Sequence, residues 1–218
     1  MLKVLYEDNH LIAVNKKSGD IVQGDKTGDT PLSDFVRSYI KKKYNKTGNV
    51  FLGIIHRLDR PTSGIVLFAR TSKALIRMNE QFRNKEIEKT YWAVVENSPP
   101  KLKGILVNYL YKNQKQNKSY VRKEGKHSIL EYKILSRLNN YYILEIKPKT
   151  GRHHQIRAQL ANIGCVIKGD IKYGAKRSNK DASIHLLAQK LEFIHPIKKE
   201  KIVLKANPPK DVIWDTCK

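Results

Sequence analysis

Apolar and polar positions in the first part of the chain follow two different periods. Residues 2–14 alternate and end in an apolar run at 11–14, so we expect two β-strands before a polar turn at 15–19. After Asp29-Thr30-Pro31, apolar side chains recur at the spacing of one helix face, which predicts a helix with a capping side chain and a proline in its first turn. Its apolar stripe comprises Leu32, Phe35, Val36, Tyr39 and Ile40, ahead of a basic end at 41–46.

The next stretch alternates short apolar runs with polar segments. A short apolar run, a polar loop and a buried strand are expected in that order, at residues 51–55, 56–64 and 65–69. Ser72 is expected to cap a helix whose apolar positions are Leu75, Met78 and Phe82, and another strand is expected at 90–95.

The second half is richer in strand patterns. Its expected strands are residues 105–111, 129–135 and 141–146, as antiparallel neighbours joined by polar turns, and then 184–188 and 202–204. Between these two groups, Gly151-Arg152-His153-His154 leads a helix with Ile156, Leu160 and Ile163 on one face and Gly164 at its C-terminal end.

Strands outnumber helices, of which about three are expected, so the sequence favours the α+β class with a mainly antiparallel sheet. No internal repeat and no linker rich in proline, glycine or serine divides the chain. We therefore expect residues 1–218 to form a single domain of one or two lobes.

Composition excludes several classes of protein. The 218 residues are 40% hydrophobic, too many for a disordered polycation, and no apolar run reaches the roughly 18 residues of a membrane span. Acidic residues stand near the N-terminus where a signal peptide needs its apolar stretch. Cys165 and Cys217 match neither a disulfide pattern nor a metal-ligand spacing, and Cys165 is expected to be a core thiol. These features favour a cytoplasmic, globular protein that does not contact a membrane.

The net charge of the chain indicates what kind of partner it binds. Lys and Arg number 43 against 20 Asp and Glu, a formal net charge of +23. RNA or DNA is the polyanion expected to meet such a surface, although a merely solvated basic surface also fits. The Lys-rich segment 112–126 has the same two alternatives, because the hairpin tip expected at its start, residues 112–120, can be solvated or can contact RNA phosphates.

Two polar segments carry candidate chemistry. In the loop 56–64, Asp59 lies between Arg57 and Arg60, and neighbouring guanidinium groups favour an ionised carboxylate. The same aspartate could instead cap a turn. In the second segment, Thr150-Gly151-Arg152-His153-His154-Gln155-Ile156-Arg157, each arginine taken alone fits a phosphate contact or a solvated surface. No spacing among the histidines supports a metal site.

Taken together, these motifs resemble those of RluA-type pseudouridine synthases. The catalytic motif of that family is matched by His56-Arg57-Leu58-Asp59 with Thr62-Ser63-Gly64. The other matching segments, in the family's order, are Tyr6-Glu7-Asp8 with residues 11–16, Lys89-Thr90-Tyr91, Gly151 to Arg157, Gly169-Asp170-Ile171-Lys172-Tyr173-Gly174, and residues 185–188 with 193–196. The resemblance spans nearly the whole chain.

The resemblance implies a fold, a reaction and a set of roles. The fold is a bent, mainly antiparallel sheet with flanking helices and a central basic cleft, and the reaction is the isomerisation of uridine to pseudouridine in RNA. Asp59 matches the essential aspartate, Tyr91 a base-stacking tyrosine, and Arg157 the arginine that pairs with the aspartate. Arg57 matches a residue that fills the gap left by the flipped base. The remaining expected RNA contacts are His56, Lys89, Arg152 and Gln155.

Further expectations follow from the same family. No S4-type RNA-binding module accompanies the motifs, and the reaction needs neither a cofactor nor a metal ion. The substrate is expected to be 23S rRNA or tRNA, and the protein is expected to act as a monomer. The alternatives are an RNA-binding or chaperone protein that has lost turnover, and a metal-dependent nuclease, which the lack of clustered carboxylates disfavours.

Overall fold

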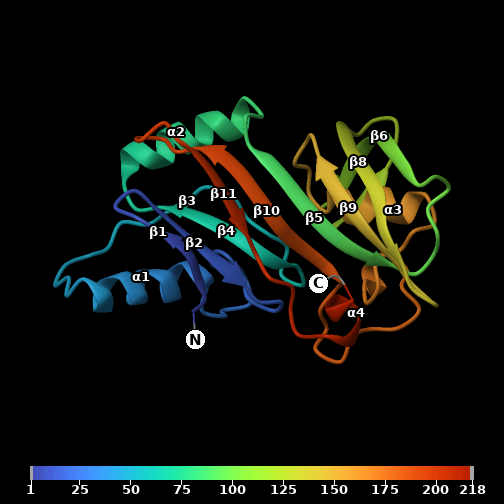
Figure 1. Ribbon diagram of the computed structural model, residues 1–218, viewed down its shortest axis with the longest axis horizontal. Helices are drawn as coiled ribbons and strands as arrows, with labels where there is room; N and C mark the ends of the chain where they lie inside the picture. Colours follow the sequence, from blue (N-terminus) through green and yellow to red (C-terminus); the bar gives the residue numbers. More distant parts are fainter. Residues whose placement is uncertain (1, 217–218) are drawn as a thin grey trace. The chain divides into compact units, whose positions relative to one another are not determined.

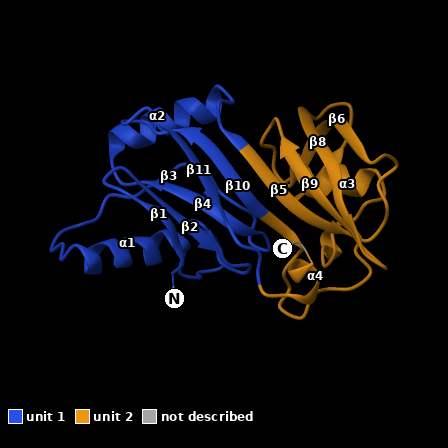
Figure 2. Ribbon diagram, viewed as in Figure 1, with its two compact units in different colours: residues 1–88, 188–209 blue, residues 89–187, 210–218 orange. Residues whose placement is uncertain are grey.

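The computed structural model describes residues 2–216, which fold into two compact units (Figure 2). Unit 1 contains residues up to Glu88 together with Ala188–Pro209, and unit 2 contains Lys89–Leu187 together with the residues from Lys210. Strands predominate over helices in both units, and most of the strand pairs are antiparallel. The expected α+β class is therefore confirmed.

Unit 1 is built from six strands and two helices (Figure 1). The strands are β1 (Val4–Glu7), β2 (Leu11–Lys16), β3 (Gly53–Ile54), β4 (Ser63–Ala69), β10 (Leu186–Ile194) and β11 (Lys201–Lys205), and the helices are α1 (Leu32–Lys43) and α2 (Ser72–Arg83). Strand order runs β1-β2-β4-β10, with β3 beside β4 and β11 beside β10. The strand expected at 184–188 thus begins later and extends further than its apolar run indicated.

Helix α1 covers one face of these strands because its apolar stripe matches theirs. Leu32, Val36 and Ile40 are buried in one cluster with residues of β2 and β4 such as Val14 and Phe68. Two expectations for this helix are wrong. Pro31 is its N-cap and no side chain caps it, since backbone N–H groups at the start bond to residues of the preceding loop instead. Phe35, assigned to the apolar stripe, is 53% exposed.

Helix α2 lies on the other side of the unit 1 strands in Figure 1. Its N-cap is Thr71, whose hydroxyl accepts a hydrogen bond from the Ala74 N–H at 3.2 Å, so the cap lies one residue before the expected Ser72. Ala74 and Met78 are buried, and the Leu75 side chain packs so closely over Gly53 that a Cβ there would lie 2.7 Å from it.

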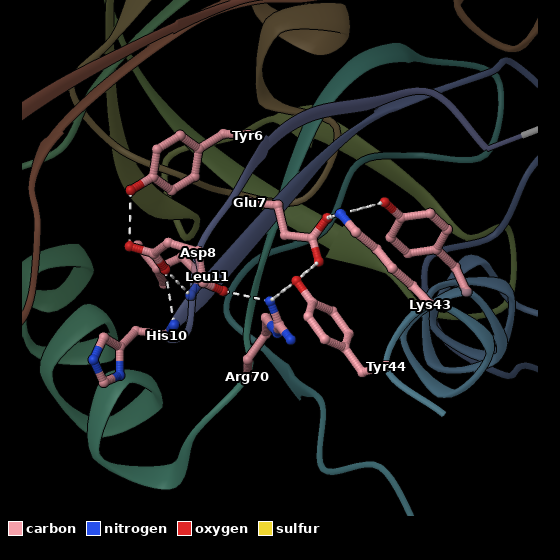
Figure 3. A network of polar contacts seen from close by, with 9 residues as sticks. Tyr6, Glu7, Asp8, His10, Leu11, Lys43, Tyr44 and Arg70 are labelled. Carbon is pink, nitrogen blue, oxygen red and sulfur yellow. Dashed lines mark hydrogen bonds and ion pairs between the residues drawn. The ribbon is translucent and has the colours of Figure 1, made fainter. Parts of the chain in front are cut away.

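A buried carboxylate ties β1 to both α1 and the end of β4 (Figure 3). Glu7 accepts hydrogen bonds from Tyr39 at 3.0 Å, Lys43 at 2.7 Å, Tyr44 at 2.8 Å and Arg70 at 3.1 Å. Burial alone would raise the pKa of Glu7, but these hydrogen bonds and the Lys43 charge outweigh it and lower that pKa. The carboxylate is therefore ionised and fully paired near neutral pH.

Unit 2 is an antiparallel sheet with one main helix. Its strands are β5 (Glu88–Val95), β6 (Lys103–Asn113), β7 (Lys118–Val121), β8 (Lys126–Arg137) and β9 (Tyr142–Pro148), in the order β5-β9-β8-β6-β7. Its helical elements are α3 (Gln155–Asn162), the 3-10 turn η1 (Ile171–Tyr173) and α4 (Val212–Asp215). Among residues 2–216, no helix combines the length and apolar composition that crossing a bilayer requires.

The unit 2 core lies between α3 and the sheet. Ile156 and Leu160 of α3 are buried against Leu144 and Ile146 of β9. The helix ends one residue earlier than its apolar pattern indicated, because Ile163 is the C-cap; Gly164 follows with φ 77°, as expected for a helix end. Cys165 is buried, which confirms a core thiol, whereas Cys217 lies outside the described residues.

Sequence patterning missed part of the hairpin in this unit. The segment 112–120, assigned to a hairpin tip, contains the last residues of β6 and most of β7, so only the residues 114–117 between the two strands form the turn. The apolar run at 51–55 likewise yields only the two-residue strand β3, and η1 and α4 had no expected counterpart. Short elements of this kind carry too few residues for a period to show.

We expect Gly64→Ala to lower the free energy of unfolding by about 3 kcal/mol or more. Gly64 has φ 117°, and a Cβ there would lie 2.3 Å from the carbonyl oxygen and 2.6 Å from the nitrogen of Ala188 on β10. Urea unfolding measures the effect. Gly48→Ala, where a Cβ meets open space, is the matched control, and equal midpoints for the two variants would contradict the prediction.

Candidate active site

The candidate carboxylate lies on a loop between two strands of unit 1. Asp59 follows β3 and precedes β4, and its main-chain oxygen accepts a hydrogen bond from the Thr62 N–H at 3.0 Å, which closes a turn. The turn foreseen as the alternative role of this aspartate is thus present, but it uses the main chain. The Asp59 side chain is half-buried, and Arg57 and Arg60 beside it are exposed.

A buried lysine holds this loop in place. Lys16, at the end of β2, is 1% exposed, and its Nζ donates to the main-chain oxygens of Lys17 at 2.9 Å, Arg60 at 3.0 Å and Thr62 at 2.7 Å. An ammonium group has three protons, so these three carbonyls use all of them. The main chain on both sides of Pro61 is therefore fixed from beneath by one cation.

Burial sets the protonation behaviour of this lysine. Removal from water lowers the pKa of Lys16 from 10.5 to about 8, against the carboxylates of Asp20 and Asp59, which raise it. Asp59 is therefore one of the negative charges that this buried ammonium experiences. Two further contacts brace the loop, because Ser18 Oγ donates to the Pro61 oxygen at 3.1 Å and the Gly19 N–H donates to the Arg60 oxygen at 2.9 Å.

His56 ties the start of the same loop to its surroundings. Its Nε2 accepts a hydrogen bond from the Leu67 N–H at 3.1 Å, and its ring stacks on Phe82 of α2 with centroids 5.2 Å apart. These contacts give His56 a part in holding the loop. The RNA contact expected of it stays a prediction, as does that of Arg57.

The second candidate group lies in unit 2, at the start of α3. Arg157 is 5% exposed and forms a two-pronged ion pair with Asp170, which is 1% exposed: Nε donates to Oδ2 at 2.7 Å and Nη2 to Oδ1 at 2.8 Å. The guanidinium carbon also lies 5.0 Å from the centroid of the Tyr173 ring. Asp170 therefore fixes the plane of the guanidinium through one edge, and Nη1 takes no part in that pair.

A chain of polar groups continues from Tyr173. Its hydroxyl accepts a hydrogen bond from the Ser119 N–H at 2.9 Å and lies 3.0 Å from Nδ1 of His154. Burial and, next, the Arg157 charge lower the pKa of His154 to about 2, so its imidazole is neutral. The Tyr173 hydroxyl and Nδ1 of His154 are therefore linked by a hydrogen bond. The segments around β7, α3 and η1 are thereby joined.

Gln155 and Arg152 occupy different surroundings. Gln155 is 4% exposed; its side-chain oxygen accepts from the Thr150 hydroxyl at 2.8 Å and the Arg152 N–H at 3.0 Å, and its Nε2 donates to the Ile129 oxygen at 3.0 Å. These bonds shape the loop before α3. Arg152 is exposed and donates from Nε to the His127 oxygen at 3.2 Å. Their expected contacts with RNA stay predictions.

Tyr91 and Lys89 are carried by β5. Tyr91 is half-buried opposite Ile146 of β9, where it packs at the margin of the unit 2 core. Lys89 is also half-buried, and burial lowers its pKa. Both side chains therefore stand on a rigid strand rather than on a loop, which suits a group that must keep its position.

The structure adds residues that the motifs did not assign. Lys16 lies beneath the Asp59 loop, and Asp170 with Tyr173 holds Arg157. All three fall within segments that match the family, but nothing in the sequence shows that they contact these groups. The described residues 2–216 contain no cluster of three His, Cys, Asp or Glu side chains able to hold a metal ion.

Comparisons with known proteins agree with one another. The family model described as RNA pseudouridylate synthase matches residues 10–162, a range that includes the Asp59 loop and the start of α3. Ribosomal large subunit pseudouridine synthase C of Buchnera aphidicola subsp. Acyrthosiphon pisum is 35% identical over 94% of this chain and 66% of its own length. The tRNA pseudouridine synthase C of Vibrio vulnificus is 32% identical over 98% of this chain and 93% of its own.

The solved structures agree on the fold. Human RNA Pseudouridylate Synthase Domain Containing 4 superposes with a TM-score of 0.82 at 22% identity, over 99% of this chain and 92% of that one. The chain spans about two thirds of the length of the Buchnera relative.

The depressed pKa of Lys16 predicts a pH dependence of stability. Between about pH 8 and 10.5 the unfolded chain binds a proton at this site that the folded chain has lost, so the contribution of Lys16 to the free energy of unfolding rises with pH. Denaturant unfolding of wild type and Lys16→Met at pH 7.5 and pH 10 measures it, because other titrating groups cancel in the difference. We expect the free energy of unfolding of wild type, relative to that of the variant, to be higher at pH 10 than at pH 7.5. A difference that does not change with pH would contradict a lowered pKa for the buried Lys16.

Proposed function

The chain belongs to the RNA pseudouridylate synthase family of isomerases, and on that basis we propose that it converts specific uridines of structured RNA to pseudouridine, with the carboxylate of Asp59 acting on the target nucleoside. The observation that supports this most is the match of the family model over residues 10–162, which contain the Asp59 loop.

The main catalytic group that the reaction requires from the protein is a carboxylate. The N1–C1′ bond of uridine breaks, the uracil turns, a C5–C1′ bond forms, the proton on C5 leaves to solvent and N1 takes up a proton, so the nucleoside keeps its atoms and electrons. Asp59 fits two roles in this sequence. It can attack C1′ as a nucleophile or remove a proton at C2′ as a base. Neither role calls for a cofactor or a metal ion, and we propose that the enzyme uses none.

Access to the uridine requires that it leave its stack, at a cost of a few kcal/mol. We propose that Tyr91 recovers part of this cost by stacking on the extruded uracil, worth about 1–3 kcal/mol, and that Arg57 fills the vacated space. These two roles fit the positions of the residues. Tyr91 lies on strand β5, which can hold a ring in a fixed place, and Arg57 is exposed on a loop, where its side chain can adapt.

We propose that Arg157 pairs with Asp59, as the family resemblance implies. The two-pronged bond to Asp170 supports a positioning function, because it orients the guanidinium through Nε and Nη2. A buried carboxylate partner also lowers the cost of keeping the guanidinium out of water.

The substrate class follows the relatives, some of which are named for the ribosomal large subunit and others for tRNA. We propose ribosomal or transfer RNA as the substrate, and a monomeric enzyme in the cytoplasm, where both RNAs are found. The excess of 43 basic over 20 acidic residues supports direct binding to such a polyanion.

We expect Asp59→Asn to abolish tritium release from RNA labelled at C5 of uridine, because the amide can neither attack C1′ nor take a proton, while RNA binding stays within about threefold of wild type. The matched control is Asp29→Asn, which removes the same charge from a half-exposed residue that pairs with Arg60 at 2.6 Å. It should retain wild-type release.

Persisting tritium release from Asp59→Asn would overturn the assignment. Wild-type protein that binds ribosomal and transfer RNA but yields no pseudouridine across a broad RNA panel would favour the alternative, an RNA-binding or chaperone protein.

We expect Arg157→Lys to reduce kcat at least about tenfold while KM changes less than about threefold. Lysine keeps the charge but lacks the planar fork that meets Asp170 through two atoms. Single-turnover kinetics at saturating RNA separate the two effects. Equal losses in turnover and affinity would mean that the residue contributes only to binding or folding, and circular dichroism of the variant distinguishes these two.

A further inference from the structure

One face of β6 is apolar and aromatic although it points to solvent. Its four successive outward positions are Ile105, Val107, Tyr109 and Tyr111, with exposed fractions of 64%, 54%, 49% and 44%. The alternate positions of the strand point to the core, where Leu110 is buried. A continuous apolar stripe of this kind on a water-facing strand is characteristic of a surface that binds something.

The aromatic end of this stripe is reinforced by neighbouring strands. Tyr111 lies opposite Tyr120 of β7, and Tyr109 lies opposite His127 of β8 with ring centroids 5.4 Å apart. The guanidinium carbon of Arg122 lies 5.7 Å from the Tyr111 ring and 5.9 Å from the Tyr120 ring. We call these five side chains the tyrosine face.

Charge around the tyrosine face is strongly positive. The segment 112–126, which contains β7 and Arg122, has six basic residues and a single acidic one. Lys118 Nζ lies 5.2 Å from the Tyr120 ring centroid. Partly exposed aromatic rings set among lysines and arginines have the composition that binds unpaired nucleic acid bases.

We propose that the tyrosine face is an RNA-binding surface on which unpaired bases of the substrate RNA stack. Tyr109 and Tyr111 are two residues apart on one strand and so about 7 Å apart, which lets each ring receive a different base. Arg122 adds a guanidinium that contacts phosphate or stacks on a base. This inference rests on the proposed function, since RNA is the substrate there, and it adds a contact surface that Asp59, Tyr91 and Arg157 do not supply.

RNA fits this face better than a protein partner does. Lysine is depleted in protein interfaces, whereas the tyrosine face adjoins the segment 112–126, which contains five lysines. Those cations would need acidic partners within a protein interface, while RNA supplies a phosphate for each base that stacks.

The test uses an RNA probe that contains no uridine, so that it cannot serve as substrate at the proposed catalytic carboxylate. The probe is a fluorescein-labelled single strand of twelve adenines and cytosines, read by anisotropy at constant salt, next to a duplex of the same length. We expect the double variant Tyr109→Leu/Tyr111→Leu to weaken single-strand binding at least about tenfold, because it removes two rings on which bases stack. Duplex affinity should change less than about threefold.

Two controls isolate the rings. Tyr109→Phe/Tyr111→Phe keeps both π-faces and should bind the single strand within about threefold of wild type. Ile105→Ala removes apolar area from the same face without removing a ring and should also leave Kd unchanged. As a gain-of-signal measurement, Tyr109→Trp should show fluorescence that the single strand quenches, over the background of Trp92 and Trp214.

Single-strand affinity that is unchanged in the double leucine variant would overturn the proposal. So would wild-type protein that sediments as a dimer while the leucine variant is monomeric, which would make this face a contact between copies of the chain. Tritium release measured on the same preparations separates the two levels. If tritium is released but single-strand binding does not depend on the tyrosines, only the proposed RNA-binding surface is wrong. If binding depends on the tyrosines but no tritium is released, only the proposed reaction is wrong.

Discussion

Three main-chain carbonyls around a single buried ammonium determine where the candidate carboxylate stands. Lys16 costs stability by being removed from water, as its depressed pKa shows, yet it donates to two carbonyls of the Asp59 loop, those of Arg60 and Thr62, and to the carbonyl of Lys17. A loop held through its backbone can keep one shape while its side chains are used for chemistry. The Asp59 loop is thus as firmly fixed as a strand, although it is polar and lies between two strands.

Unit 2 contains a similar arrangement in which the charges are reversed. There a buried carboxylate, Asp170, fixes the guanidinium of Arg157, a candidate site residue, whereas in unit 1 a buried cation lies beneath the loop of the candidate carboxylate. In both units the supporting group is almost fully buried and uses the geometry of its hydrogen bonds rather than charge alone. A substitution at either supporting residue is therefore expected to act on the chemistry through position.

The sequence predicted those features that depend on a repeated pattern or an ordered set of motifs. The strands of unit 1, the three main helices and the α+β class follow from apolar periods, and the family follows from motifs spread over the chain. Features set by tertiary contacts were not predictable. The exposure of Phe35, the cap at Thr71 and the short strand β7 depend on neighbours distant in sequence. Lys16 illustrates the limit well, because a lysine beside another lysine and a serine gives no sign that it is buried beneath a loop more than forty residues away.

Unit 1 is formed by two segments that are far apart in the sequence, and this has a consequence for folding during synthesis. Its strand β4 needs β10 alongside, yet β10 and β11 follow the whole span Lys89–Leu187 that builds unit 2. During translation the first 88 residues emerge long before their missing strands, with the β4 edge unprotected. The five strands β5 to β9 of unit 2 are complete by residue 148, so its sheet can become ordered before the sheet of unit 1, although unit 1 begins at the N-terminal end of the chain.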